Sequence, residues 1–243
     1  ASSSPETVDH LQFLQAWGTS VTRVFLLAVF DKSLGVSESD QLRYTRILEA
    51  LTVRWNLTGG NAQEFETLLQ VAALALRGGE QDYDQVVAPF KLDMPTDEAF
   101  KSSFHNAGRG VKARLVLAKL DSKLLGSGIV VDHSLYKIDY VAPQTQNQEW
   151  RGVLFPQEQA NIDQEYKASV EKWGNLVLVR KEDTTAASGL RFELKKVTTD
   201  EHLGYADSDI ELTKSVAQNH QWTRSEISDR ADRIGELAAE LWS

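Results

Sequence analysis

Three polar residues lie in two short apolar segments that are typical of β-strands. Asp139 and Tyr140 belong to the segment 138–141, and Asn175 follows Gly174 at the start of the segment 174–178. A carboxylate and a second oxygen or nitrogen ligand can hold a divalent ion such as Mg²⁺ or Mn²⁺, which stabilises the charge that develops on a phosphate during hydrolysis. These residues are therefore candidates for metal-assisted hydrolysis of a phosphodiester.

The elements that must position these residues follow one another in a particular order. The two strands are followed by a short helix that ends at Lys196. This order of strand, strand and helix is that of a ββα-metal finger, in which a His deprotonates the attacking water and an Asn orients that His. We therefore expect Asp139 to bind the metal and Asn175 to orient the residue at the base position.

The rest of the chain has a mainly helical pattern. Residues 7–125 show apolar side chains at helical spacing, with Ser37 and Asn61 as helix caps, and the pattern stops at Gly126. A capping box, Thr223-x-x-Glu226, begins another helix near the C-terminus. The predicted fold class is α+β and mainly helical. An N-terminal helical bundle over residues 1–125 precedes a ββα-metal (HNH-like) finger with flanking C-terminal helices over residues 126–243.

Composition excludes several kinds of protein. The 243 residues contain no Cys, so thiolate metal sites and disulfides are absent, which favours a cytoplasmic protein. The longest apolar run, Val24 to Phe30, is far shorter than the roughly 20 residues that cross a bilayer, so no membrane segment is expected. The chain starts Ala-Ser-Ser-Ser without Met, and we expect it to be part of a longer polypeptide.

Charge is unevenly distributed along the chain. The net charge is −9, which alone argues against nucleic acid, yet residues 101–123 contain six Lys or Arg and one acid, a local net charge of +5. A basic helix face is more often simply solvated, and lysines at a helix end complement its C-terminus. Against these alternatives, the candidate DNA-binding residues are Arg109, Lys112, Lys119, Lys123, Lys195 and Lys196.

The chain resembles the C-terminal effector domain of GmrSD-type restriction proteins, including the phosphorothioate-sensing SspE proteins. The similar segments extend over nearly the whole chain, and they are Arg54, 94–100, 113–120, 138–144, 173–178, 192–196, Trp222, Ile227, Arg230, Leu237 and Trp242. The resemblance implies an HNH nuclease that follows a helical region and nicks or cleaves DNA. It also implies an N-terminal sensor domain of the same protein, absent from this chain, that hydrolyses a nucleotide and controls the nuclease.

The chain departs from the family pattern at two positions. The family motif acidic-His-Ile-x-Pro-Gln matches Asp139, but Tyr140 stands at the place of the His. The Gly-Asn-Leu motif matches Asn175, and Thr184 replaces an Asn or His that completes the metal site. A Tyr with a pKa near ~10 is a poor general base at neutral pH.

Three interpretations follow from these replacements. The chain cuts DNA through a variant site that uses Tyr140 or His133; it has lost the metal site and binds DNA or protein; or the motif is aligned incorrectly here. The leading hypothesis is a metal-dependent, DNA-nicking effector domain of a modification-dependent anti-phage restriction system. The alternative is a catalytically degenerate DNA-binding or protein-interaction module that retains the nuclease fold.

Overall fold

The computed structural model describes residues 4–126, 130–157, 160–182 and 189–243. Helices dominate, and two short strands form one antiparallel sheet, so the prediction of a mainly helical α+β fold is confirmed. Within the described residues, no helix is both long and apolar enough to cross a membrane. The contacts divide the chain into two compact units, residues 1–100 with 242–243 and residues 101–241. The boundary expected at residue 125 lies inside the second unit, where a helix ends.

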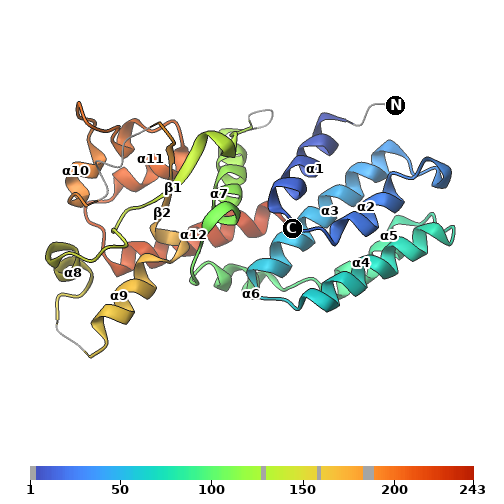
Figure 1. Cartoon of the computed structure of the whole chain (residues 1–243), viewed down its shortest axis with the longest axis horizontal. Helices are drawn as coiled ribbons and strands as arrows, with labels where there is room; N and C mark the ends of the chain where they lie inside the picture. Colours follow the sequence, from blue (N-terminus) through green and yellow to red (C-terminus); the bar gives the residue numbers. More distant parts are fainter. Residues whose placement is uncertain (1–3, 127–129, 158–159, 183–188) are drawn as a thin grey trace. The chain divides into compact units, whose positions relative to one another are not determined.

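The first unit is a helical bundle (Figure 1). Its core contains Phe25, Leu48, Leu69 and Phe90, none of which has exposed surface. The bundle is built from α1 Pro5–Trp17, α2 Thr22–Val29, α3 Glu38–Leu57, α4 Ala62–Arg77 and α5 Tyr83–Asp93, and α6 Asp97–Ser103 begins in it.

Polar side chains set the starts of two of these helices, as the sequence predicts. The hydroxyl of Ser37 accepts a hydrogen bond from the backbone amide of Asp40, and the side-chain oxygen of Asn61 accepts two from the first turn of α4. These bonds satisfy amides that have no partner within the helix. The predicted caps are therefore confirmed.

A buried arginine ties the last residues of the chain to the first unit. The guanidinium of Arg54 donates to the carbonyl of Trp242 (2.8 Å), to the carbonyl of Pro95 (2.9 Å) and to the carboxylate of Asp97 (2.6 Å). The indole of Trp242 donates to Glu49 (2.8 Å). Arg54, Glu49 and Trp242 are buried and have lost their hydrogen bonds to water, so these bonds within the protein replace them.

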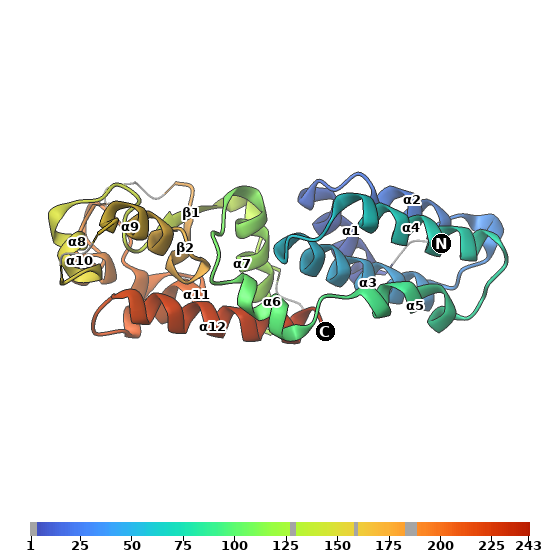
Figure 2. The ribbon, with the colours of Figure 1, turned by 90° about the horizontal axis from the view of Figure 1, so that it is seen from below.

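The second unit contains the strands and the remaining helices, which Figure 2 shows from below. Strand β1 (Tyr136–Tyr140) pairs with β2 (Leu176–Arg180), and the register places Asp139 opposite Val177. The helices are α7 Gly110–Leu125, α8 Gln148–Leu154, α9 Ile162–Val170, α10 Phe192–Lys196, α11 Glu211–Lys214 and α12 Arg224–Leu241. The expected order of strand, strand and short helix is therefore present.

Helix α12 lies against the short turn Trp173–Asn175 that leads into β2. At its start, the predicted capping box is present, because Glu226 accepts from the amide of Thr223 (2.8 Å) and the hydroxyl of Thr223 accepts from the amide of Ser225 (3.2 Å). One turn further, the carbonyl of Ile227 lies 1.8 Å from the point that a Cβ on Gly174 would occupy. Only glycine allows the two backbones to approach this closely.

We expect Gly174→Ala to destabilise the protein by at least about 3 kcal/mol, because the backbone of α12 must move to make room for the methyl group. The matched control is Gly152→Ala in α8, where a Cβ meets nothing within 4 Å and a helical alanine should add about 0.5–1 kcal/mol. Urea unfolding followed by circular dichroism measures both. Equal stability of the two variants would contradict the packing described here.

Candidate functional site

The side chain of Asn175 connects several segments around the two strands. Its amide nitrogen donates to the carbonyls of Ala142 and Val170, both at 2.8 Å. Its amide oxygen accepts from the backbone N–H of Ala142 (2.8 Å) and from the indole of Trp222 (3.0 Å). Since Asn175 has no exposed surface, its amide serves to hold the backbone directly after β1. The expected side-chain contact between Asn175 and Tyr140 is not among these bonds.

A buried arginine on α12 supports the same region. The guanidinium of Arg230 donates to the carbonyls of Gly174 (2.8 Å), Leu176 (2.6 Å) and Leu212 (3.1 Å). Burial lowers the pKa of Arg230 to about 10, so the side chain stays charged at neutral pH. The sequence marked Arg230 only as a position shared with the family; its role depends on three carbonyls that the fold brings together.

Asp139 is half-buried on β1 and has positive and aromatic neighbours. Its charge raises the pKa of Lys195 on α10 and that of Tyr205, although burial has the larger effect on both groups. The hydroxyl of Tyr205 is buried and has no hydrogen-bond partner among the described residues. Nothing in the sequence distinguished Tyr205, since an isolated Tyr in a loop carries no periodic signal.

Lys195 has no exposed surface and cannot reach a DNA phosphate in this conformation, contrary to expectation. Its ammonium donates to the carbonyl of Tyr140 (2.9 Å), and burial lowers its pKa to about 8. The adjacent Lys196 pairs with Glu193 (2.9 Å) and donates to the carbonyl of Asn219 (3.1 Å). Both lysines therefore stabilise the fold around α10.

Tyr140 lies at the end of β1, beside Glu171 and Arg109. Burial raises the pKa of its phenol, the charges of Glu171 and Asp139 raise it further, and Arg109 opposes them. The phenol is therefore protonated at neutral pH and suited to donate a hydrogen bond rather than to accept a proton from water.

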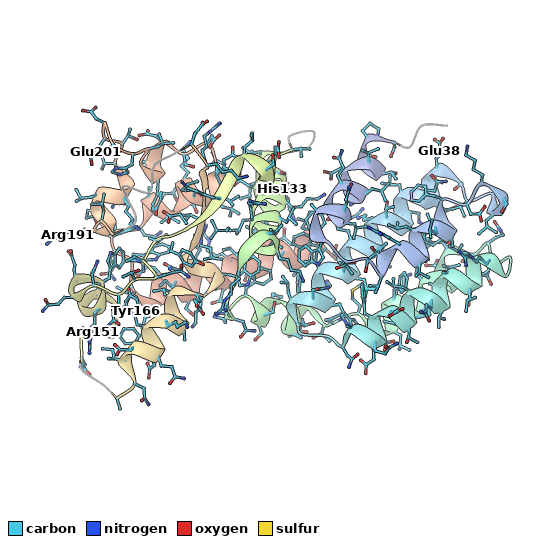
Figure 3. All side chains as sticks on the ribbon, viewed as in Figure 1. Glu38, His133, Arg151, Tyr166, Arg191 and Glu201 are labelled. Atoms are coloured by element: carbon cyan, nitrogen blue, oxygen red, sulfur yellow. The ribbon has the colours of Figure 1, made fainter. Side chains whose placement is uncertain are left out.

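His133, the other residue considered for the base, lies just before the opposite end of β1 (Figure 3). Burial lowers the pKa of His133, so the imidazole is neutral at pH 7 and able to accept a proton. However, His133 precedes β1 and Tyr140 ends it, and the strand separates Tyr136 from Tyr140 by about 13 Å at about 3.3 Å per residue. Asp139 is not among the charged groups that shift the pKa of His133.

The described residues contain no preformed cluster of metal donors. No group of three or more His, Asp or Glu that could hold an ion occurs among them, and Thr184 lies outside the described residues. Asp139 offers one carboxylate. Mg²⁺ is commonly held by one or two carboxylates together with substrate phosphates and water. This donor set fits an ion that binds with a phosphodiester rather than a preformed protein cage.

The predicted basic face of α7 is partly neutralised by acids from other segments. Arg109 forms an ion pair with Glu171, and Lys123 pairs with Glu240 at 3.0 Å. Lys112 is exposed and Lys119 is half-buried. The local charge of +5 is therefore not all available to a polyanion, and DNA binding by these four residues stays a prediction.

The second unit has a mainly helical α+β fold, in which one antiparallel pair of strands is followed by a short helix. Residues 93–237 match the family model for the C-terminal domain of GmrSD restriction endonucleases. This match covers more than half of the chain, which therefore belongs to that family, as its sequence motifs predicted. A search of curated proteins found no match.

Replacing Asn175 by Asp tests the connecting role of its amide. The variant sets a carboxylate oxygen against the carbonyls of Ala142 and Val170, so we expect a loss of at least about 3 kcal/mol in the free energy of unfolding. Asn61→Asp is the matched control, because Asp caps a helix about as well as Asn and should change stability by less than about 0.5 kcal/mol. Chemical unfolding measures both. A neutral Asn175→Asp would contradict the assigned bonds.

Lys195 should make stability depend on alkaline pH. Its pKa is about 8 in the folded chain and near the ordinary 10.5 in the unfolded chain, so the unfolded chain binds more protons between these values. The free energy of unfolding should rise through this window by up to roughly 3 kcal/mol relative to Lys195→Met, which lacks the ionisable group. Urea unfolding at pH 7.5 to 10 measures the difference. The exposed Lys167→Met is the control and should follow the wild type.

Proposed function

We propose that this chain contains a metal-dependent DNA endonuclease domain, which nicks DNA as the effector of a modification-dependent restriction system active against phage. The observation that carries the proposal is the family match over residues 93–237, because the matched region includes Asp139 on β1, Asn175 before β2 and helix α10. A nucleotide-hydrolysing sensor domain of the same protein would control the activity. DNA is the substrate that a restriction nuclease requires.

In this proposal each described residue has a separate role. Asp139 would hold Mg²⁺ or Mn²⁺ together with the phosphodiester, and the ion would supply Lewis-acid stabilisation of the negative charge on phosphate. Tyr140 keeps its proton and donates a hydrogen bond from its phenolic oxygen to the phosphate. Asn175 and Lys195 fix the backbone on either side of that phenol, at Ala142 and at the carbonyl of Tyr140.

The second candidate function is a degenerate DNA-binding or protein-interaction module. It is favoured by the raised pKa of Tyr140 and because the described residues contain no group of three or more His, Asp or Glu that could hold an ion. Both observations concern the residues that would activate water, and neither concerns binding. The two functions therefore differ in whether the chain cleaves DNA. Where the module binds nucleic acid, both functions have DNA as a ligand.

Plasmid nicking in Mg²⁺ or Mn²⁺ tests the proposed activity. We expect the wild type to convert supercoiled plasmid to open circles and EDTA to abolish the reaction. Asp139→Asn should lower the rate by about 10² or more because a neutral amide holds the ion poorly. The control is Asp163→Asn, an equally sized change at an exposed carboxylate on α9, which should retain the wild-type rate.

Two outcomes would contradict the assignment. Absence of metal-dependent nicking by the wild type overturns the enzyme function and leaves the degenerate module. Unchanged nicking in Asp139→Asn retains the enzyme function but overturns Asp139 as the ligand.

A Tyr140→His variant separates the two functions further, because restoring the family's base should raise the rate of a site that is otherwise complete.

A further inference from the structure

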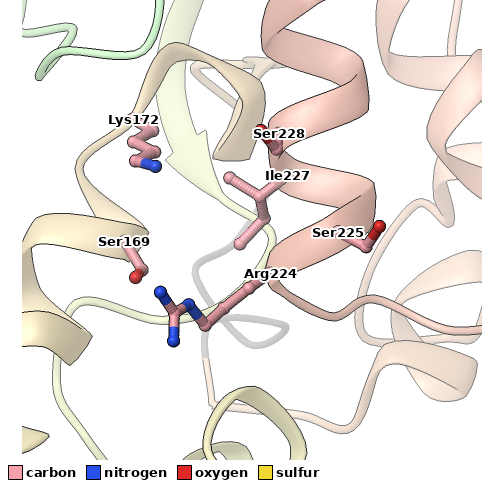
Figure 4. A pocket seen from close by; sticks show the side chains of 6 residues that line it. All are labelled: Ser169, Lys172, Arg224, Ser225, Ile227 and Ser228. Carbon is pink, nitrogen blue, oxygen red and sulfur yellow. The ribbon is translucent and has the colours of Figure 1, made fainter.

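A polar pocket in the second unit lies next to the turn that carries Asn175. Its volume is about 310 Å³, and it is lined by Ser169, Lys172, Arg224, Ser225, Ile227 and Ser228 (Figure 4). The lining combines two cations with three hydroxyl groups and contains no carboxylate. Such a set of donors is suited to an oxyanion, since ammonium, guanidinium and hydroxyl groups all donate hydrogen bonds to phosphate.

Ser169 adds a hydroxyl to the donors of the pocket. It lies on the last turn of α9, and although only 6% of the residue is exposed, it is part of the pocket lining. Figure 4 shows the hydroxyl directed toward the guanidinium of Arg224, across the pocket. A hydroxyl in this position can donate a hydrogen bond to a ligand oxygen in the pocket.

The two cations are available to such a ligand. Lys172 has no ion-pair partner among the described residues, and its neighbour Glu171 is engaged by Arg109. Arg224 lies over the ring of Phe155, 4.7 Å from its centre, and its one carboxylate neighbour, Glu165, is 3.8 Å away. Both Arg224 and Glu165 are about half exposed, so this ion pair is weak.

The pocket lies beside the segment that leads to Asn175. Asn175 donates to the carbonyls of Val170 and Lys172, which follow Ser169 in the chain. Ile227, the apolar residue of the lining, is the residue whose carbonyl abuts Gly174. The start of α12, where the positive end of the helix dipole favours anions, adds to the attraction, although Glu226 already occupies part of it.

We propose that this pocket binds a backbone phosphate of the DNA next to the one that is cut. The inference rests on the proposed function. In that function the segment 169–175, which contains both pocket residues and Asn175, would hold two successive phosphates of one DNA strand. A nucleotide base is a poorer occupant, since the lining offers a single apolar side chain and the nearby ring of Phe155 is covered by Arg224. A phosphodiester needs only the cations and hydroxyls that are present.

Two variants change the pocket in different ways. Lys172→Gln removes one cation. Ser228→Asp places a carboxylate one helical turn after Arg224, where it can pair with that cation and repel phosphate. An Asp near the start of a helix and four residues from an Arg does not lower helix stability. Ser228→Asp should therefore keep its thermal stability and lose DNA affinity. Lys167→Gln on the exposed face of α9 is the control with the same change in charge.

The experiment is fluorescence anisotropy of a labelled duplex with the full 243-residue chain in EDTA, where cleavage is absent. Both pocket variants should bind about tenfold more weakly, with unchanged thermal unfolding, while Lys167→Gln binds like the wild type. In Lys172→Gln the slope of log K against log salt should fall by about 1, as expected for the loss of one phosphate contact.

The following results would overturn the inference. Wild-type affinity in both pocket variants overturns it while leaving the nicking experiment untouched, whereas no duplex binding by the wild type overturns it together with the proposed function. Equal weakening in Lys167→Gln indicates a diffuse basic surface in place of a pocket. If inorganic phosphate stabilises the wild type but not Lys172→Gln, and the DNA affinities are equal, the pocket takes a free anion instead of DNA.

Discussion

The second unit depends on the buried amide of Asn175. One side chain of four heavy atoms satisfies both backbone groups of Ala142, the carbonyl of Val170 and the indole of Trp222. These partners come from three separate parts of the chain, and all three residues are buried. Since a buried polar group must be paired, the strand pair, the end of α9 and the entry to α12 are held in one arrangement.

Charged side chains reinforce this arrangement from within the protein. Lys195 and Arg230 are both buried, and both donate to backbone carbonyls of the strands or the turn before β2. Burial lowers the pKa of each, because the loss of water disfavours the charged form more than the carbonyl dipoles favour it. The basic residues that face solvent are partly paired with acids. In a protein with a net charge of −9, the pocket beside Asn175 brings two cations, Lys172 and Arg224, to one place.

The family pattern and the geometry agree on the framework and differ on the reacting groups. Asp139 lies on β1, and Asn175 directly precedes β2. Tyr140 replaces the family's His, and its raised pKa makes it a hydrogen-bond donor at neutral pH. The change removes a proton acceptor from this position. Framework and chemistry can thus vary separately, because the framework is set by Asn175, Gly174 and Arg230, which do not react.

The sequence by itself determined the helices with their caps, both strands, the short helix after them and the family. These features depend on neighbours three or four residues apart, or on alternation within a strand, so a linear pattern contains them. Only the tertiary structure decided that Lys195 is buried, that His133 lies at the opposite end of β1 from Tyr140, and that Ser169, Lys172 and Arg224 form one pocket. Burial and the meeting of distant residues arise from packing across the fold, and no local period in the chain records which segments meet.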